Sequence, residues 1–399
     1  MATIERLIVR NFATLRNIDL KLSDLMVLVG QNDAGKTNVL RALNFLSALS
    51  KQDVQTAVAR LGGIRTLCWA GNYQEGLQIT VHGKLPSIKK TPSYQYDVAL
   101  YQKDLSGKVI FGQESLQIEG HTSATREAEM VKVGSWKTPD LDSGLLYHAN
   151  QKSSLSAESS EAQNIQSWLR SDVVQAIAGA LGRLEIYKLN PDSIAKPAAI
   201  RVDPRMDFDG TGFPTLLESF SSNPERQDAF DDIIENLRRL VPSFHRVGVV
   251  TTQHAQHLLK ELQFQVRVGE ERMLIGGNQV SDGLLLLLGV LVLSRSNTPL
   301  VMLEEPENGI HVRALKELVS MLRELTKTGQ LRLLMTTHSP YLLDHLSPEE
   351  VCIVTRNDSG DSRLTTMSEF PELPKWRRGF SLGEIWTNLG EEKMARLDG

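Results

Sequence analysis

Hydrophobic and polar positions over the first part of the chain predict short strands interrupted by one helix. Strand-like patterns occupy three segments before residue 30, namely 4–9, 18–22 and 26–29. A helical spacing of apolar residues follows, at Val39, Leu40, Leu43, Leu46 and Leu49. Partial alternation predicts four more strands, at residues 77–81, 94–101, 108–112 and 114–119. Their polar connectors favour an antiparallel sheet.

Helical patterns dominate the middle of the chain. We expect one helix over residues 165–181 and another over 224–240, with the turn-rich stretch 203–212 between them. The polar, serine-rich residues 150–163 are expected to form a loop. Two strand-like segments, 249–252 and 262–268, are expected to return to the main body of the protein.

The pattern changes again from residue 275 onward. A polar segment precedes an apolar run over 284–293, which is expected to be a buried helix. A strand at 299–303, a helix at 313–326 and a strand at 331–337 follow. This order predicts a parallel α/β core. We therefore divide the chain into a first lobe, 1–135, a mainly helical insert, 136–265, and a second lobe, 266–399.

Composition narrows the class of protein. The chain has 399 residues, of which 41% are hydrophobic and 23% charged, as in ordinary globular proteins of two lobes or domains. Its net charge of −4 excludes a global basic field that would attract nucleic acid or membranes. Two cysteines are too few for a disulfide framework and suit a reducing cytoplasm. The longest apolar run, 284–293, is about half of what a bilayer requires, so no membrane partner is expected.

The candidate chemistry begins at residues 30–37, which read G-Q-N-D-A-G-K-T between a predicted strand and a predicted helix. Glycines allow backbone N–H groups to surround a phosphate, and the following helix points its positive end at the same anion. Lys36 would reach the β- and γ-phosphates of a nucleotide, and the hydroxyl of Thr37 would ligate Mg²⁺. The nucleotide-contacting residues are then expected to be Gly30, Asn32, Ala34, Gly35, Lys36, Thr37 and Asn38.

Two carboxylates at the end of the strand at 299–303 predict the other half of an ATP site. Glu305 would activate the attacking water as general base, and Glu304 would hold Mg²⁺ directly or through water. His338 follows the next predicted strand, where its imidazole would bond the γ-phosphate or orient the water. Ser281, Asp282 and Gly283 open the apolar helix and offer a hydroxyl and a helix N-terminus to an anion.

Four segments, taken in order, resemble motifs of the ABC-type ATPase heads of the RecF/SMC class. They read G-Q-N-D-A-G-K-T, S-D-G, E-E-P-E-N-G-I-H and T-T-H-S-P. That class includes the OLD nucleases and related ATPases of bacterial antiphage defence. The resemblance implies an α/β, P-loop NTPase head with a mixed or parallel core sheet, an antiparallel β-subdomain and a helical insert. It also implies catalytic roles for Lys36, Glu305 and His338, with ATP and Mg²⁺ as cofactors.

In such heads ATP is sandwiched between two protomers. The resemblance therefore implies a homodimer or a higher even-numbered oligomer, in which Ser281, Asp282 and Gly283 cap the γ-phosphate of a second subunit. Asn308 would lie at the same interface. A glutamine that links the metal site to the helical lobe has three candidates, Gln113, Gln117 and Gln151.

The wider role has three readings. No acidic D-x-D cluster follows His338, so we expect no Toprim nuclease domain in this chain and a separate effector, either a Toprim or HNH nuclease or a toxin. The alternatives are a RecF-like ATPase of DNA repair and an ATP-locked scaffold with slow turnover. Residues 374–386 combine cations with aromatics, and contact with DNA, docking of a partner and packing on their own lobe all remain open.

Overall fold

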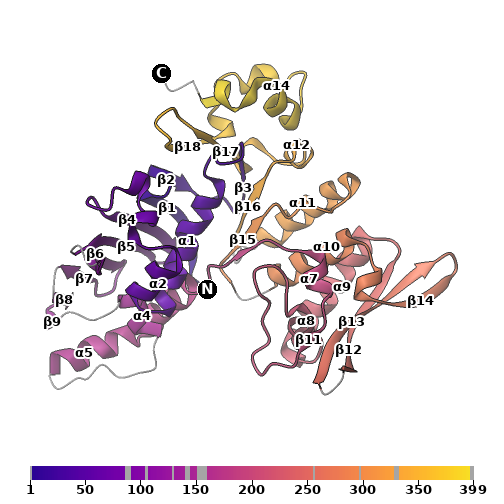
Figure 1. Cartoon of the computed structure of the whole chain (residues 1–399), viewed down its shortest axis with the longest axis horizontal. Coiled ribbons are helices and arrows are strands. Elements are labelled where there is room, and N and C mark those ends of the chain that lie inside the picture. Colours follow the sequence, from indigo (N-terminus) through magenta and orange to yellow (C-terminus); the bar gives the residue numbers. More distant parts are fainter. Residues whose placement is uncertain are drawn as a thin grey trace.

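A mainly parallel central sheet lies between two antiparallel sheets, one at each end of the molecule (Figure 1). The computed structural model describes residues 2–85, 91–103, 107–127, 130–139, 144–150, 160–254, 257–295, 298–327 and 332–395. Most of the serine-rich segment expected to be a loop, together with Gln151, lies outside these residues. Residues 160–163 of that segment already belong to a helix.

The first sheet has eight strands in the order β2-β1-β4-β5-β6-β7-β8-β9, and every neighbouring pair is antiparallel. Its strands are β1 (Thr3–Phe12), β2 (Leu15–Lys21), β4 (Leu77–Lys84), β5 (Ser93–Gln102), β6 (Val109–Ile118), β7 (Ala124–Glu127), β8 (Met130–Val133) and β9 (Trp136–Pro139). The two strands predicted at residues 108–112 and 114–119 form the single strand β6. The register of its pairing with β5 shifts between Ala99 and Leu100. Gly112 suits this bulge because a Cβ there would lie 2.2 Å from the Tyr101 ring.

The central sheet has six strands in the order β10-β15-β16-β3-β17-β18, and only its last pair is antiparallel. Its strands are β3 (Leu25–Val29), β10 (Ile186–Tyr187), β15 (Leu300–Glu304), β16 (Arg332–Thr337), β17 (Val351–Arg356) and β18 (Ser362–Thr366). The continuous apolar runs of β3, β15 and β16 fit a sheet that is covered on both faces. The parallel core that the sequence predicts is confirmed.

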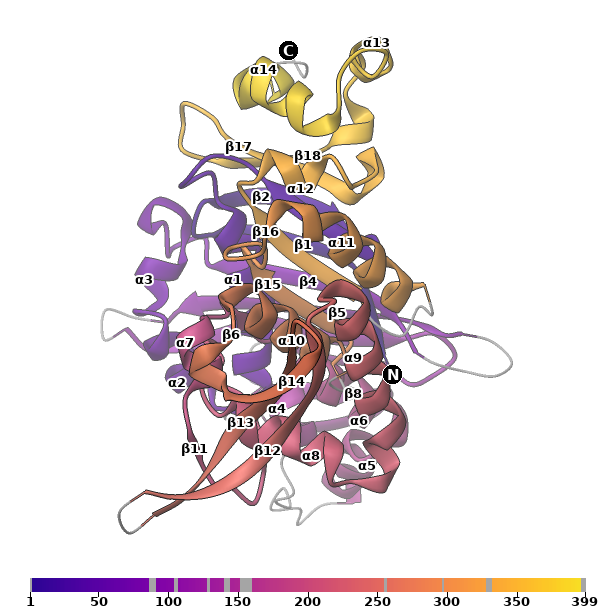
Figure 2. The same ribbon diagram turned by 90° about the vertical axis from the view of Figure 1, so that its right-hand side faces the viewer.

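Alternate residues of the central strands pack into two different cores. Met26 and Leu28 of β3 join the core formed with the eight-stranded sheet, whereas Leu25, Val27 and Val29 join the opposite core. In Figure 2 the helices α10 and α11 lie over β15 and β16 on the opposite side. The main helices of the first core are α1 (Lys36–Lys51), α2 (Val54–Arg60), α3 (Ile64–Leu67), α4 (Leu145–Asn150), α5 (Ser160–Leu169) and α6 (Asp172–Leu181).

The second core contains most of the remaining helices. They are α7 (Pro191–Ala195), α8 (Phe213–Ser221), α9 (Gln227–Leu240), α10 (Asp282–Ser294), α11 (Val312–Thr326), α12 (Pro340–Leu343), α13 (Leu373–Trp376) and α14 (Leu382–Ala395). The apolar run at 284–293 is a buried helix, as predicted. Within the described ranges, no helix combines the length and the apolar character needed to cross a bilayer.

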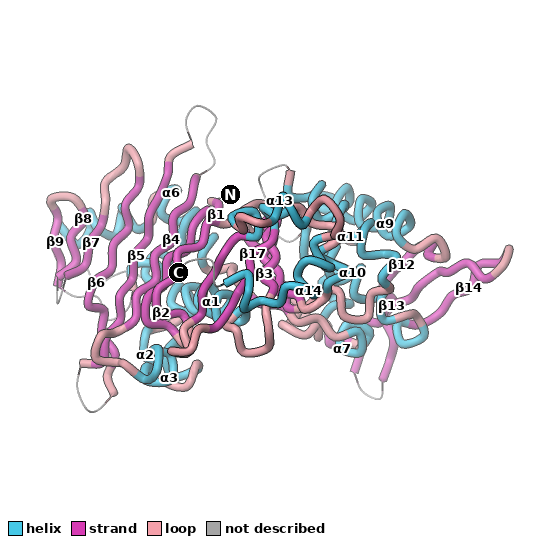
Figure 3. The backbone as a smooth tube through the Cα atoms, turned by 90° about the horizontal axis from the view of Figure 1, so that it is seen from above, coloured by secondary structure: helices cyan, strands magenta, loops and turns pink. Residues whose placement is uncertain are grey.

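A third sheet lies at the far end of the second core (Figure 3). It has the order β11-β13-β12, and β14 pairs with β13. Its strands are β11 (Ala198–Ala199), β12 (Phe244–His254), β13 (His257–Val268) and β14 (Glu271–Gly276). The expectation that the strands near 249 and 262 return to the main body is therefore wrong, because they pair with each other and pack their apolar face on α8 and α9.

Two details of the helical region also differ from the expectation. The helix predicted over 165–181 is two helices, since Ser171 is extended and begins α6. The predicted boundary between residues 265 and 266 falls inside β13, and β9 continues the first sheet beyond residue 135. The three-part division of the chain remains a proposal.

Candidate nucleotide-binding site

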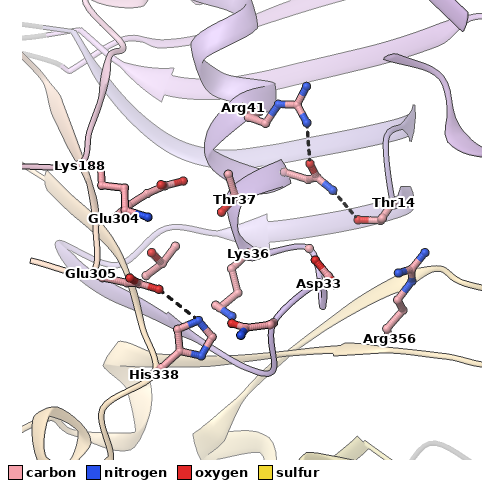
Figure 4. A pocket seen from close by; sticks show the side chains of 14 residues that line it. Thr14, Asp33, Lys36, Thr37, Arg41, Lys188, Glu304, Glu305, His338 and Arg356 are labelled. Carbon is pink, nitrogen blue, oxygen red and sulfur yellow. Dashed lines mark hydrogen bonds and ion pairs between the residues drawn. The ribbon is translucent and has the colours of Figure 1, made fainter. Parts of the chain in front are cut away.

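Three neighbouring parallel strands bring the sequence motifs to one edge of the central sheet. Glu304 at the end of β15 is in register with Thr336 of β16, and Thr337 is in register with Val29 of β3. The residues that follow these strands therefore emerge side by side. Ligands of α/β sheets bind at such carboxyl edges. A cleft of about 450 Å³ lies there (Figure 4).

Close packing explains both glycines of the phosphate loop. A Cβ on Gly30 would lie 2.1 Å from the carbonyl oxygen of Val354, and one on Gly35 would lie 2.0 Å from the Ser362 hydroxyl. Gly35 also has a φ of 108° and is the N-cap of α1. The loop is thus held against β17 and β18 by contacts that only glycine permits.

Lys36 is the first residue of α1 and is buried. Its ammonium donates to the carbonyl oxygens of Gly30 at 2.6 Å and Gln31 at 2.7 Å, so it lies folded over the loop. The cleft is lined by Asn32, Gly35, Lys36, Thr37 and Asn38 among the predicted loop residues. Ala34 is buried instead, and its carbonyl accepts a hydrogen bond from Ser362 at 2.7 Å. Gly30 packs beneath the loop.

Glu305 and His338 meet on the opposite wall of the same cleft. Nε2 of His338 lies 3.3 Å from Oε1 of Glu305, and the Asn308 amide donates to Oε2 of Glu305 at 2.9 Å. Glu305 adopts a left-handed backbone with φ of 47°, and its N–H donates to the Thr336 carbonyl at 3.0 Å. Such strained conformations of residues other than glycine persist where the surroundings enforce them, often at functional sites.

Partial burial and a neighbouring cation favour the neutral form of His338. Partial burial and the neighbouring Lys36 ammonium lower the pKa of His338, and the carboxylate of Glu305 opposes them. A neutral ring with its proton on Nε2 donates a hydrogen bond to Glu305. The pair therefore presents an oriented carboxylate to the phosphate loop.

Glu307 is a buried carboxyl group that supports this wall. It accepts a hydrogen bond from the hydroxyl of Thr337, the residue before His338, and its other oxygen is buried with no hydrogen-bond partner among the described residues. The Thr337 hydroxyl in turn accepts from the Ser339 N–H at 2.9 Å. Burial raises the pKa of Glu307. The sequence shows Glu307 within the segment E-E-P-E-N-G-I-H but does not reveal that its side chain is buried.

The S-D-G segment lies apart from the cleft. Ser281 is the N-cap of α10, and its side chain forms no capping hydrogen bond. A Cβ on Gly283 would lie 3.0 Å from the Gly309 carbonyl, so the segment packs on the turn after Asn308. The residues that line the cleft of the same chain include none of Ser281, Asp282, Gly283 and Asn308.

Several cleft residues were missed by sequence reasoning. They are Thr14, Asp33, Arg41, Lys188, Thr336 and Arg356. Arg356 ends β17 and reaches the cleft because that strand is a parallel neighbour of β3, a pairing that the sequence motifs do not indicate. Lys188 follows β10, which has only two residues and gives no pattern. The two described glutamine candidates, Gln113 and Gln117, lie in β6 and do not line the cleft.

The donor groups fit a hard divalent cation. Thr37 offers a hydroxyl and Glu304 a carboxylate in the same cleft, which are oxygen ligands of the kind Mg²⁺ prefers. In the part of the chain that the structure describes, no cluster of three or more His, Cys, Asp or Glu residues could hold a metal ion. A site of one or two protein ligands is typical of Mg²⁺ bound together with nucleotide phosphates.

Two family models match parts of the chain. Residues 3–124 match the family described as "AAA ATPase domain", and residues 218–344 match the family described as "AAA domain, putative AbiEii toxin, Type IV TA system". No curated protein matches the chain. The two matches contain the phosphate loop, the S-D-G segment and the Glu304–Glu305 pair.

The chain is also similar to solved structures of SMC heads. An SMC head bound to the C-winged helix domain of ScpA has a TM-score of 0.51 and 13% identity, covering 91% of this chain and 97% of that chain. The SMC head domain from Thermotoga maritima has a TM-score of 0.46 and 12% identity, covering 91% and 98%. An SMC head with an extended coiled coil from Pyrococcus furiosus, bound to the C-terminal domain of ScpA, has a TM-score of 0.47 and 11% identity, covering 95% and 100%.

The fold is that of an SMC head-like P-loop NTPase, as the first of these structures shows. The AAA ATPase matches and this fold together support the SMC/RecF-like class of ABC ATPases. The comparisons do not extend to the OLD nucleases.

Proposed function

We propose that this chain binds ATP with Mg²⁺ and hydrolyses it to ADP and phosphate. The observation that carries the proposal is the Glu305–His338 pair, joined at 3.3 Å, facing a glycine-enforced phosphate loop across one cleft. A phosphate-binding loop alone fits many nucleotide-binding proteins. An oriented carboxylate opposite it adds the general base that hydrolysis needs.

The chain's own residues perform the following roles. The N-terminus of α1 and the ammonium of Lys36 hold the β- and γ-phosphates, and release of Lys36 from the Gly30 and Gln31 carbonyls accompanies binding. Glu305 accepts a proton from water as the water oxygen attacks the γ-phosphorus and the bond to the bridging oxygen breaks. His338 holds the carboxylate and the water in place. Thr37 and Glu304 would hold Mg²⁺, which neutralises charge on the phosphates.

A second copy of the chain completes the site in this proposal. The exposed Ser281 hydroxyl is not used for capping its own helix, and it does not line its own cleft. The turn that holds Asn308 packs beside it. ATP would therefore join two chains, with Ser281, Asp282 and Gly283 of one facing the γ-phosphate bound by the other, and hydrolysis would release them.

The cellular role follows as part of the same proposal. The match of residues 218–344 to a family described by a type IV toxin–antitoxin system favours an ATPase that regulates a separate effector, a nuclease or toxin, in bacterial defence. A RecF-like repair ATPase and an ATP-locked scaffold are the alternatives. A relationship to the OLD nucleases and a cytoplasmic location are part of the proposed role in bacterial defence.

Steady-state phosphate release by the purified chain tests the proposal. We expect Mg²⁺-dependent turnover that is abolished by Lys36→Ala. Turnover that Lys36→Ala leaves unchanged would contradict it. Adding double-stranded DNA separates the roles, because strong stimulation favours the repair ATPase and indifference favours a protein partner. A Glu305→Gln chain that keeps its biological function while Lys36→Ala loses it would favour the scaffold.

A further inference from the structure

Lys188 places a cation in the nucleotide cleft from outside the sequence motifs. It follows β10, which pairs in parallel with β15, and Tyr187 is in register with Leu303. The next residues along these two strands are Lys188 and Glu304. Both line the cleft, and Figure 4 shows Lys188 on the same side as Glu304 and Glu305.

The ammonium of Lys188 has no competing partner within the described part of the chain. The side chain is exposed, and the structure records no hydrogen bond or ion pair for its Nζ atom among the described residues. The Lys188 N–H donates to the Phe208 carbonyl at 2.8 Å, which places the residue at the edge of the cleft. An exposed ammonium in this position is suited to contact a ligand anion.

The position of Lys188 indicates which phosphate of a bound nucleotide it would contact. Arg41 and Arg356, the other cleft cations outside the phosphate loop, lie beside Thr14 and Asp33, across the cleft from Glu305 (Figure 4). Glu305 must face the water that attacks the γ-phosphorus. A cation on the Glu305 side therefore lies near the γ-phosphate rather than near the nucleoside.

We propose that Lys188 contacts the γ-phosphate of bound ATP and thereby makes the site prefer ATP to ADP. This inference rests on the proposed ATPase function and adds a residue that the motifs do not contain. The contact would draw the segment after β10 toward the phosphate only while the γ-phosphate is present.

The same segment contacts the helix that begins with the S-D-G signature. A Cβ on Gly289 of α10 would lie 3.1 Å from a methyl group of Leu189 and 3.1 Å from a methyl group of Ile194. Leu189 is the residue after Lys188, and Ile194 lies in α7. Movement of Lys188 is thus passed to α10 through direct packing, because close-packed interiors transmit displacement. The γ-phosphate would in this way set the position of Ser281.

Calorimetric titration with a non-hydrolysable ATP analogue and with ADP, both with Mg²⁺, tests this proposal. Lys188→Met should weaken binding of the ATP analogue by about tenfold or more and leave ADP affinity unchanged, since a charge-assisted hydrogen bond to the third phosphate is lost. Lys188→Arg should restore most of the preference. Lys196→Met, on an exposed lysine of the same segment outside the cleft, is the matched control and should change neither affinity.

Equal losses for both nucleotides, or no loss for either, would overturn the role of Lys188. Failure of the ATPase proposal is a different result, namely a wild-type chain whose nucleotide binding is absent or does not depend on Lys36.

Discussion

Nε2 of His338 lies 3.3 Å from Oε1 of Glu305, although the two residues belong to different strand ends. The parallel register of β15 and β16 makes this contact, and the left-handed backbone of Glu305 turns its carboxylate toward the cleft. Asn308 holds the other carboxylate oxygen at 2.9 Å. The general base of the proposed reaction is therefore oriented from both sides before a nucleotide binds.

Glu305→Gln should separate binding from hydrolysis. The amide keeps the size of the side chain but cannot accept the proton, so we expect turnover to fall by about 10²- to 10⁴-fold while ATP affinity is kept. Because hydrolysis no longer separates the chains, sedimentation of this variant with ATP should show a dimer. A strict monomer at micromolar concentration would contradict the account.

The pKa of His338 should respond in opposite directions to its two charged neighbours. Burial and Lys36 hold it below the ordinary value of 6.5, and Glu305 raises it. Lys36→Met should therefore raise the pKa of His338, and Glu305→Gln should lower it further. NMR titration of labelled histidine measures both shifts. Shifts of the same sign would show that the three groups do not face one another as described.

Gly30→Ala should destabilise the protein through a contact that the loop cannot avoid. The added Cβ would lie 2.1 Å from the Val354 carbonyl oxygen, so we expect the free energy of unfolding to fall by about 1–3 kcal/mol. Gly248→Ala is the control, because a Cβ there meets nothing within 4 Å. Its effect should stay within about 0.5 kcal/mol. Denaturant unfolding measures the free energy of unfolding of both variants. Equal losses in the two variants would contradict the described packing of the loop.

Glu307 should stabilise the protein best when it is uncharged. Burial raises its pKa above the ordinary value of 4.5, so its favourable contribution is complete at low pH and is lost as pH rises through the pKa of the folded state. Glu307→Gln cannot ionise, and its stability relative to wild type should increase with pH. Glu307→Ala leaves the Thr337 hydroxyl without its acceptor and should cost about 1–3 kcal/mol. Thermal unfolding between pH 4.5 and pH 8 tests both, and a Gln variant that loses stability relative to wild type as pH rises would be contrary to this account.

Local patterns in the sequence were sufficient for three neighbouring strands of the central sheet, β3, β15 and β16, and for the motifs at their ends. The apolar runs of β3, β15 and β16 are long enough to be recognised, and parallel strands necessarily bring their carboxyl ends together. The predicted loop, carboxylates and histidine therefore meet in one cleft. The assignment of roles to these residues stays a prediction.

Features that depend on pairing over long distances could not be predicted. Lys188 enters the cleft because a strand of two residues pairs with β15, and so short a strand has no recognisable period. The hairpin of β12 and β13 has an ordinary alternating pattern, which does not specify the sheet it joins. The break at Ser171 comes from one extended residue within a continuous helical pattern, and the pattern does not mark it.

One working site is built from two chains in the proposed dimer, and mixing two inactive variants tests this arrangement. Lys36→Ala removes the phosphate contact, and Ser281→Glu places a carboxylate where the γ-phosphate of the other chain would lie. Each variant alone should release no phosphate above background. In an equimolar mixture, mixed dimers contain one intact loop facing one intact signature, and we predict about a quarter of wild-type turnover per chain. A mixture of correctly folded variants that stays inactive, or full turnover by Ser281→Glu alone, would contradict the account.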